Sequence, residues 1–212
     1  MLKTLLFFLV LNGNNPDSNC NSDYTNQILN ETEQIEVSSP AVDTASVGYK
    51  LLTAAKKYLG VPYTWGGRSK KGLDCMGLIF LAYSDMTGKS WRNLSVYPSR
   101  LVKSKRLGKP VKGLDGVVTN STDSIGNLTH EMKVGDIIYL LTPSRIIKDD
   151  SLVAIDSAGY WPWHMGLYAG NGNILHANPC PTEEKPGSVI LESLLQLLER
   201  TGTPAIFVTR IK

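Results

Sequence analysis

The sequence predicts an α+β fold, in which one or two helices, including the helix that begins at Cys75, pack on a central antiparallel sheet. In the first half of the chain, apolar residues recur at three- and four-residue spacing over residues 47–59 and 75–86, the pattern of helices. In the second half, short runs of β-branched and aromatic residues alternate with turn-forming residues, the pattern of strands joined by hairpins. This segregation is typical of the α+β class. With 212 residues and 42% hydrophobic side chains, the chain can form one domain with its own core.

The two predicted helices lie on either side of an aromatic loop. The loop, residues 61–67, ends in two glycines, which allow a backbone to approach its neighbours closely. The second helix begins at Cys75, and Gly88 ends it. We therefore expect the loop to run close to Cys75, which is buried at the start of its helix.

The strands are expected from residue 132 onward. Apolar or alternating patterns predict them at 137–141, 152–155, 164–169, 174–177 and 205–211. The turn over residues 170–173 is rich in residues that accept a positive φ, which predicts a hairpin. Residues 189–198 have a helical pattern.

Two stretches have weaker patterns. A helical turn is predicted over residues 97–102. The basic stretch over 103–112 is expected to form a solvated surface or a groove wall for an acidic ligand. A loop or hairpin is predicted over residues 113–129, which are rich in turn-forming residues. Residues 144–163 predict a long connection ahead of His164. Both stretches are candidate walls of a groove.

The N-terminal region is predicted to lie outside the domain. Lys3 precedes a short apolar run, which predicts a signal peptide over residues 1–20 that is too short to span a bilayer as a helix. A polar flexible linker is expected over residues 21–46, and the folded catalytic domain over 47–212. Cys20 is either an ordinary cysteine of this tail or a lipid attachment site, and membrane association is expected only in the second case.

Composition limits the classes of partner. The net charge of +3 and the absence of a long basic run argue against nucleic-acid binding. We find no phosphate-binding loop and no cluster of cysteines and histidines at metal-ligand spacing, so we expect neither a cofactor nor a metal. Three widely separated cysteines argue against a disulfide framework and leave room for a free reactive thiol.

Cys75 is the candidate nucleophile. The amide groups at a helix N-terminus favour an anion, so they are expected to lower the thiol pKa toward the thiolate, the nucleophilic form. The alternative is a small buried apolar residue. Two of the three histidines, His164 and His176, lie on one predicted hairpin and nearly opposite each other, so that one imidazole can orient the other. This pattern favours a cysteine–histidine hydrolase, with His130 left as a surface residue.

Five segments resemble the motifs of the NlpC/P60 family of cell-wall cysteine peptidases, in the order in which that family has them. VPYTWGG at 61–67 resembles the family motif P-Y-x-W-G-G, and DCMGL at 74–78 resembles D-C-S-G-L. VGDIIY at 134–139 resembles P-G-D-L-V-F. HMGLYAGNG at 164–172 resembles H-V-G-I-Y-x-G-N-G, and LHA at 175–177 resembles the x-H-A that follows it. The resemblance covers residues 48–212. Met76 departs from the family pattern, because it stands where the family has serine.

The resemblance implies a papain-like core with a Cys-His-His triad. By carry-over, Cys75 is the nucleophile, His164 the general base and acid, and His176 the orienting residue. Tyr63, Trp65 and Asp74 are the implied substrate-binding residues: Tyr63 beside the oxyanion, and Asp74 toward the free amine of a stem peptide. The implied reaction is hydrolysis of an amide bond in peptidoglycan stem peptides, typically between γ-D-glutamate and a diamino acid, by a secreted, periplasmic or cell-envelope thiol protease that acts as a monomer.

Other readings stay open. The same triad supports an amidase, deamidase or transferase that acts on another amide or ester, including an effector against competing bacteria. A non-catalytic wall-binding module and a zinc site formed by Cys75, His164 and His176 are further alternatives.

Overall fold

The computed structural model describes residues 43–119, 128–143, 150–180 and 187–212. The predicted signal peptide and most of the predicted linker lie outside these ranges. The helices are α2 (Val47–Lys56), α3 (Cys75–Thr87), α4 (Pro98–Lys103) and α6 (Leu194–Thr201). The strands are β1 (Arg68–Ser69), β2 (Gly72–Leu73), β3 (Lys109–Val118), β4 (Ile137–Pro143), β5 (Val153–Ile155), β6 (Ala158–Gly170), β7 (Asn173–Ala177), β8 (Val189–Ser193) and β9 (Ala205–Arg210). The α+β prediction is confirmed.

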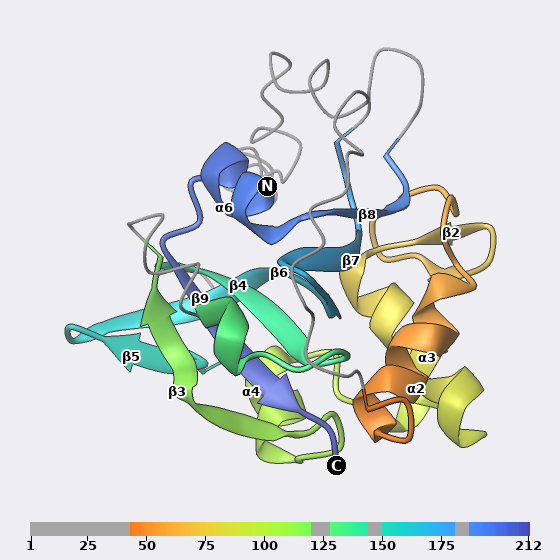
Figure 1. Cartoon of the computed structure of the whole chain (residues 1–212), viewed down its shortest axis with the longest axis horizontal. Helices are drawn as coiled ribbons and strands as arrows, with labels where there is room; N and C mark the ends of the chain where they lie inside the picture. The colour runs from red at the N-terminus through yellow and green to blue at the C-terminus, as the bar shows by residue number, and fades with distance from the viewer. Residues whose placement is uncertain (1–42, 120–127, 144–149, 181–186) are drawn as a thin grey trace, which may run out of the picture.

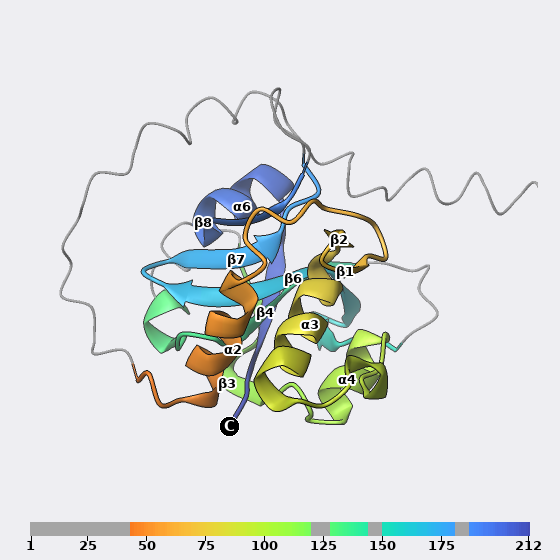
Figure 2. The same cartoon turned by 90° about the vertical axis from the view of Figure 1, so that its right-hand side faces the viewer.

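Seven of the strands form one sheet. Its order is β3-β9-β4-β6-β7-β8, with β5 paired to β6, and every pair is antiparallel. Helices α2 and α3 run side by side over one face, and α6 lies near the β7–β8 edge (Figures 1 and 2). Apolar clusters form on both faces of β4, which explains why residues 137–141 are a continuous apolar run with no exposed surface.

Local signals set the helix ends. The Ser46 hydroxyl caps α2 by accepting a hydrogen bond from the Tyr49 N–H at 3.1 Å. Asp74 caps α3 in the same way, and Gly88 ends that helix with a positive φ of 68°. Both predicted helices are therefore confirmed, and Cys75 is the first residue of α3.

The hairpin between β6 and β7 places the two histidines. Its loop is Asn171–Gly172, both with positive φ, which matches the right-handed twist of the strands. Gly166 pairs with His176, so His164 lies two residues farther along the same face. The two histidines are therefore diagonal neighbours across the hairpin, with a stagger of two residues from the near opposition that the sequence predicted.

Several strands depart from the prediction. β3 occupies residues 109–118, where we expected a solvated surface or groove wall followed by a loop or hairpin. β6 begins at Ala158, inside the predicted long connection. Residues 189–193 form β8, where we predicted helix, because the helix starts only after Ser193, whose hydroxyl accepts from the Gln196 N–H. In the part of the chain that the structure describes, no helix is long and apolar enough to cross a membrane.

Candidate active site

Asp74 fixes the start of the helix that carries Cys75. One carboxylate oxygen accepts a hydrogen bond from the Gly77 N–H at 2.6 Å and pairs with the Arg68 guanidinium, and the other accepts from the Gly66 N–H at 3.1 Å. Asp74 is only 8% exposed. Its carboxylate therefore ties the aromatic loop, the β1 strand and the first turn of α3 together around the cysteine.

The loop also lies directly against the helix. A Cβ atom added to Gly77 would stand 2.0 Å from the carbonyl oxygen of Gly67, so no larger residue fits at position 77 without moving the loop. The Tyr63 N–H donates to the Gly187 carbonyl oxygen, which anchors the other end of the loop beside β8. The sequence correctly predicted that this loop runs close to Cys75.

The thiol of Cys75 is free and half-buried. Burial raises its pKa from 9.0 to about 12, and the Asp74 carboxylate adds to that shift, whereas hydrogen bonds from the N–H groups of Met165 and Met76 and the charge of Arg68 lower the pKa. The amide at the helix start therefore lowers the pKa of the thiol, as the sequence predicted, but this effect is smaller than the increase caused by burial. The resting thiol is protonated at neutral pH, which corrects the expected thiolate.

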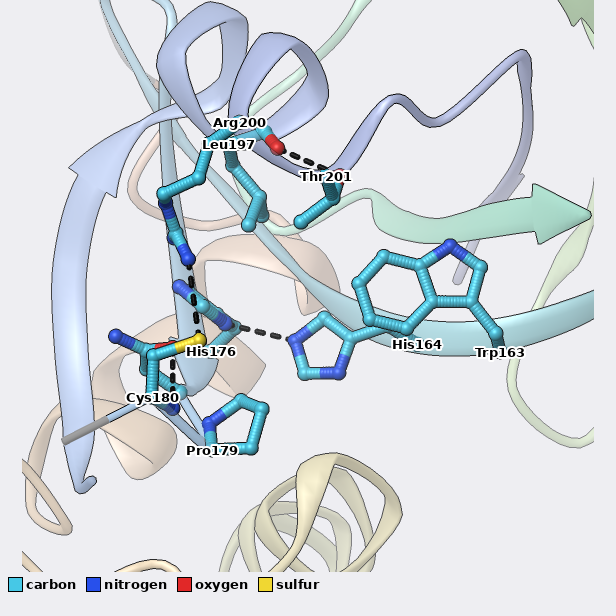
Figure 3. A pocket seen from close by; sticks show the side chains of 9 residues that line it. Trp163, His164, His176, Pro179, Cys180, Leu197, Arg200 and Thr201 are labelled. Atoms are coloured by element: carbon cyan, nitrogen blue, oxygen red, sulfur yellow. Dashed lines mark hydrogen bonds between the residues drawn. The ribbon is translucent and has the colours of Figure 1, made fainter. Parts of the chain in front are cut away.

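His164 and His176 form a buried pair. Nε2 of His164 lies 2.7 Å from Nδ1 of His176, and the two rings are perpendicular. Trp163 stacks on the His164 ring, with centroids 5.1 Å apart (Figure 3). Burial lowers the pKa of His164 well below 6.5, and the neighbouring His176 and Arg200 lower it further, so His164 is a neutral imidazole at neutral pH.

Two further residues extend this chain of contacts, and sequence reasoning missed both. Nε2 of His176 lies 2.5 Å from a carboxylate oxygen of Glu192 on β8, and Arg200 on α6 donates to both oxygens of that carboxylate at 2.8 and 3.0 Å. A buried acidic residue on a strand could have signalled this contact, but the helix predicted over residues 189–198 concealed the strand.

A small, open hollow lies beside the two histidines. Its wall includes Trp163, His164, His176, Cys180 and Arg200, and Figure 3 shows Arg200 reaching from α6 toward Cys180. Arg200 donates to the Cys180 sulfur at 3.3 Å. Cys180 takes part in a disulfide bond, which the sequence did not predict, whereas Cys75 is the free thiol for which the cysteine count left room.

The predicted substrate-binding residues differ in their surroundings. Trp65 is 74% exposed on the loop next to Cys75, and Tyr63 is half-buried against the helix-side core. Asp74, by contrast, has both oxygens bonded to protein donors. His130 is exposed, as predicted, and does not belong to the site.

Among the residues that the structure describes, no group of three His, Cys, Asp or Glu side chains is arranged to hold a metal ion. The chemical groups that the site does offer are a thiol at a helix start, a neutral imidazole and an acceptor chain behind that imidazole. This combination suits proton transfer to and from a nucleophile.

A thiol at the start of a helix that packs on an antiparallel sheet, with two histidines on that sheet, defines the papain-like class of α+β cysteine-hydrolase folds. A model of the NlpC/P60 family matches residues 60–185, and the chain belongs to that family.

Curated relatives are modestly similar. "Probable peptidoglycan endopeptidase LytE" of Bacillus subtilis is 26% identical over 128 residues, which cover 60% of this chain and 26% of the relative. "Murein DD-endopeptidase MepH" of Escherichia coli is 26% identical over 120 residues, or 56% of this chain and 32% of the relative. The matches span between 12% and 46% of the lengths of such curated relatives.

One solved structure shares the fold, and a second superposes less well. An N-acetylmuramoyl-L-alanine amidase of Bacteroides uniformis superposes with a TM-score of 0.50 at 15% identity, over 78% of this chain and 98% of that one. The NlpC/p60 domain of the peptidoglycan hydrolase SagA superposes with a TM-score of 0.44 at 20% identity, over 77% and 98% of the two chains. At these identities the likeness concerns the fold alone.

Proposed function

We propose that the chain is an exported cysteine endopeptidase that hydrolyses an amide bond of peptidoglycan stem peptides, the bond between γ-D-glutamate and the diamino acid. The observation that carries the proposal is the hydrogen bond between the Cys75 thiol and the amide of Met165, the residue that follows His164. The His164 ring is in turn hydrogen-bonded to His176. Relatives named as peptidoglycan or murein endopeptidases support the substrate class.

In the proposed reaction, His164 acts first as general base. It accepts the thiol proton of Cys75 as the sulfur attacks the scissile carbonyl carbon, so proton transfer and attack are coupled because neither the thiolate nor the imidazolium is favoured at rest. The amide of Cys75, in the first turn of α3, donates to the developing oxyanion, with Tyr63 beside it.

The second half of the cycle restores the enzyme. His164 returns its proton to the leaving amine as the carbon–nitrogen bond breaks, which leaves a thioester on Cys75. Water then loses a proton to His164 and attacks the thioester carbonyl, and the sulfur leaves and takes that proton back. The products are a new carboxylic acid and a free amine, with His176 holding the His164 ring throughout.

Substrate recognition is assigned to the loop before α3. The exposed Trp65 indole offers an apolar face beside the nucleophile, and Tyr63 and Asp74 complete that side of the site. Because Asp74 already bonds Arg68 and two N–H groups, it would bind the substrate amine only through a lone pair that these donors leave available. We propose that the chain acts outside the cytoplasmic membrane or in the cell envelope, as a monomer.

The test is mass spectrometry of soluble stem peptides incubated with the wild-type chain and with single variants. We expect cleavage after γ-D-glutamate by the wild type and none by Cys75→Ala. His164→Ala should lower kcat by about 10³-fold, within the usual range for a general acid–base residue. His176→Ala should lower it by about 10²-fold, as expected when a catalytic group is misplaced. His130→Ala, which changes an exposed histidine, is the matched control and should retain full activity.

The outcomes separate the alternatives. Cleavage that persists in folded Cys75→Ala would refute the nucleophile. A mass change without chain cleavage would indicate deamidation or transfer. Retention on peptidoglycan by wild type and Cys75→Ala alike, without products, would indicate a binding module.

A further inference from the structure

The second histidine of the pair is held from behind by a strand that the sequence did not predict. In the β7–β8 ladder, Ile174 pairs with Glu192 and His176 pairs with Ile190. Glu192 is therefore the diagonal neighbour of His176 on the same face of the sheet, within reach of a long side chain. His176 is fully buried and Glu192 is 5% exposed, so their contact at 2.5 Å is shielded from water.

Arg200 completes the Glu192 site from the other side. Its guanidinium donates to both carboxylate oxygens, and its side chain is only 7% exposed. Burial opposes ionisation, but the hydrogen bond to His176 and the charge and hydrogen bonds of Arg200 outweigh it and lower the pKa of Glu192. Since Arg200 already neutralises the carboxylate, Glu192 does not require a second cation in His176.

The ionised carboxylate determines where the protons of both histidines lie. A carboxylate can only accept hydrogen bonds, so Nε2 of His176 must carry a proton. In a neutral imidazole the other nitrogen is then an acceptor, and Nδ1 of His176 faces Nε2 of His164 at 2.7 Å. Nε2 of His164 must therefore be the donor of that bond, which leaves Nδ1 of His164 without a proton.

We infer that Glu192, clamped by Arg200, is a positioning residue that sets the tautomers of His176 and His164 in series, and so keeps Nδ1 of His164 able to accept the thiol proton. The inference rests on the proposed function for the role of that proton, but the tautomers themselves can be observed without any substrate. Glu192 acts through two rings and does not touch the reacting atoms.

The first experiment observes the tautomers directly. The chain has only three histidines, so long-range ¹⁵N–¹H correlation spectra of the uniformly labelled wild type at pH 7 can be assigned with His130→Ala. We expect His164 and His176 both to be neutral and protonated at Nε2. An imidazolium signal for His176, or protonation of either ring at Nδ1 alone, would overturn the inference.

The second experiment replaces the carboxylate by an amide of the same shape. In Glu192→Gln the amide can donate to His176, so we expect both rings to shift toward the Nδ1–H tautomer. We also expect kcat to fall by about 10²- to 10⁴-fold, since the equivalent carboxylate-to-amide change in a serine-protease triad costs about 10⁴-fold. KM should change by less than about threefold because Glu192 touches no substrate. Glu199→Gln, on the exposed side of helix α6, which also carries Arg200, is the matched control.

Each result has a separate meaning. A folded Glu192→Gln with wild-type kcat and unchanged tautomers would overturn the inference. If Glu192→Gln fails to fold, the wild-type spectra still test the inference, because they report the tautomers of both histidines directly. If the wild type cleaves no stem peptide but both rings carry Nε2–H, the positioning role of Glu192 stands and the proposed substrate is wrong.

Discussion

The protonated resting state of Cys75 distinguishes this site from one with a preformed thiolate. Burial and the Asp74 carboxylate disfavour the thiolate of Cys75 more than two backbone amides and the charge of Arg68 favour it. Burial also keeps His164 neutral. Because the folded pKa is raised above that of the unfolded chain, the preference of the folded state for the protonated thiol begins to cost stability only above pH 9.

Alkylation of Cys75 should therefore be slow at neutral pH. With the pKa of the thiol at about 12, we expect its rate with iodoacetamide to rise continuously from pH 7 to beyond pH 9, because the thiolate is the reacting species. The urea-unfolded chain should instead level off above pH 9. Site-resolved mass spectrometry measures the rate at Cys75, with Cys75→Ala as the blank. A plateau between pH 6 and pH 8 would show a resting thiolate–imidazolium pair and contradict the expectation.

Packing of the first helix on the sheet depends on one close backbone approach. A Cβ atom on Gly135, just before β4, would lie 1.9 Å from the carbonyl oxygen of Gly48 in α2. Gly135 also has a positive φ of 85°. The turn before β4 and the first turn of α2 therefore meet backbone to backbone, which seats α2 beside α3.

Gly135→Ala should consequently destabilise the domain more than strain alone explains. Gly60→Ala is the matched control, because Gly60 also has a positive φ but meets nothing within 4 Å. We expect Gly60→Ala to lower the free energy of unfolding by about 1 kcal/mol through left-handed strain. Gly135→Ala should lose about 2 kcal/mol more through overpacking. Urea denaturation measures both, and equal losses would mean that the close approach is unimportant.

The elements that sequence reasoning identified are those with strong local signals. The capped helices, the apolar run of β4 and the Asn171–Gly172 hairpin each depend on residues within a few positions of one another. β3 escaped notice because it is an edge strand that buries only Leu114, so it has no alternating pattern. β8 and α6 merged into one predicted helix because the leucines of the helix continue the apolar spacing of the strand across Ser193.

The last strand is joined to the sheet centre by a buried ion pair. Arg210 of β9 donates to both carboxylate oxygens of Asp136, at 2.8 and 2.7 Å, and Asp136 is 1% exposed. Asp136 also accepts from the Lys133 N–H at 2.8 Å. The carboxylate thus holds together the turn before β4 and the C-terminal end of the domain.

Loss of this pair should weaken the whole domain. Arg210→Ala would leave the Asp136 charge buried and unpaired, at a cost of about 3 kcal/mol in the free energy of unfolding. Lys103→Ala is the matched control: its pair with Asp150 is exposed at both ends, so we expect no measurable loss. Thermal and urea unfolding of the two variants tests this, and an equally small effect of both would refute a central role for Asp136.

At the scale of the whole molecule, the candidate site combines parts that differ in how far sequence could reveal them. Cys75 and the two histidines can be recognised from the local motifs that contain them, and the hairpin alone predicts that the histidines are close. Glu192 and Arg200 cannot, because their contacts depend on the register of β7 with β8 and on the docking of α6. The protonation of Cys75 likewise depends on burial in the core that α3 forms with β6 and β7.

The protonation of Cys75 also affects how readily its sulfur is oxidised. Peroxides attack thiolates and scarcely attack thiols, and oxidation that proceeds beyond the reversible sulfenic acid to sulfinic acid inactivates a cysteine irreversibly. A sulfur that ionises only with difficulty while no substrate is present would survive long exposure to oxidants, and the ordinary thiol of the unfolded chain would not. Folding itself would then protect the Cys75 sulfur from oxidation, because the folded chain holds it as the unreactive thiol.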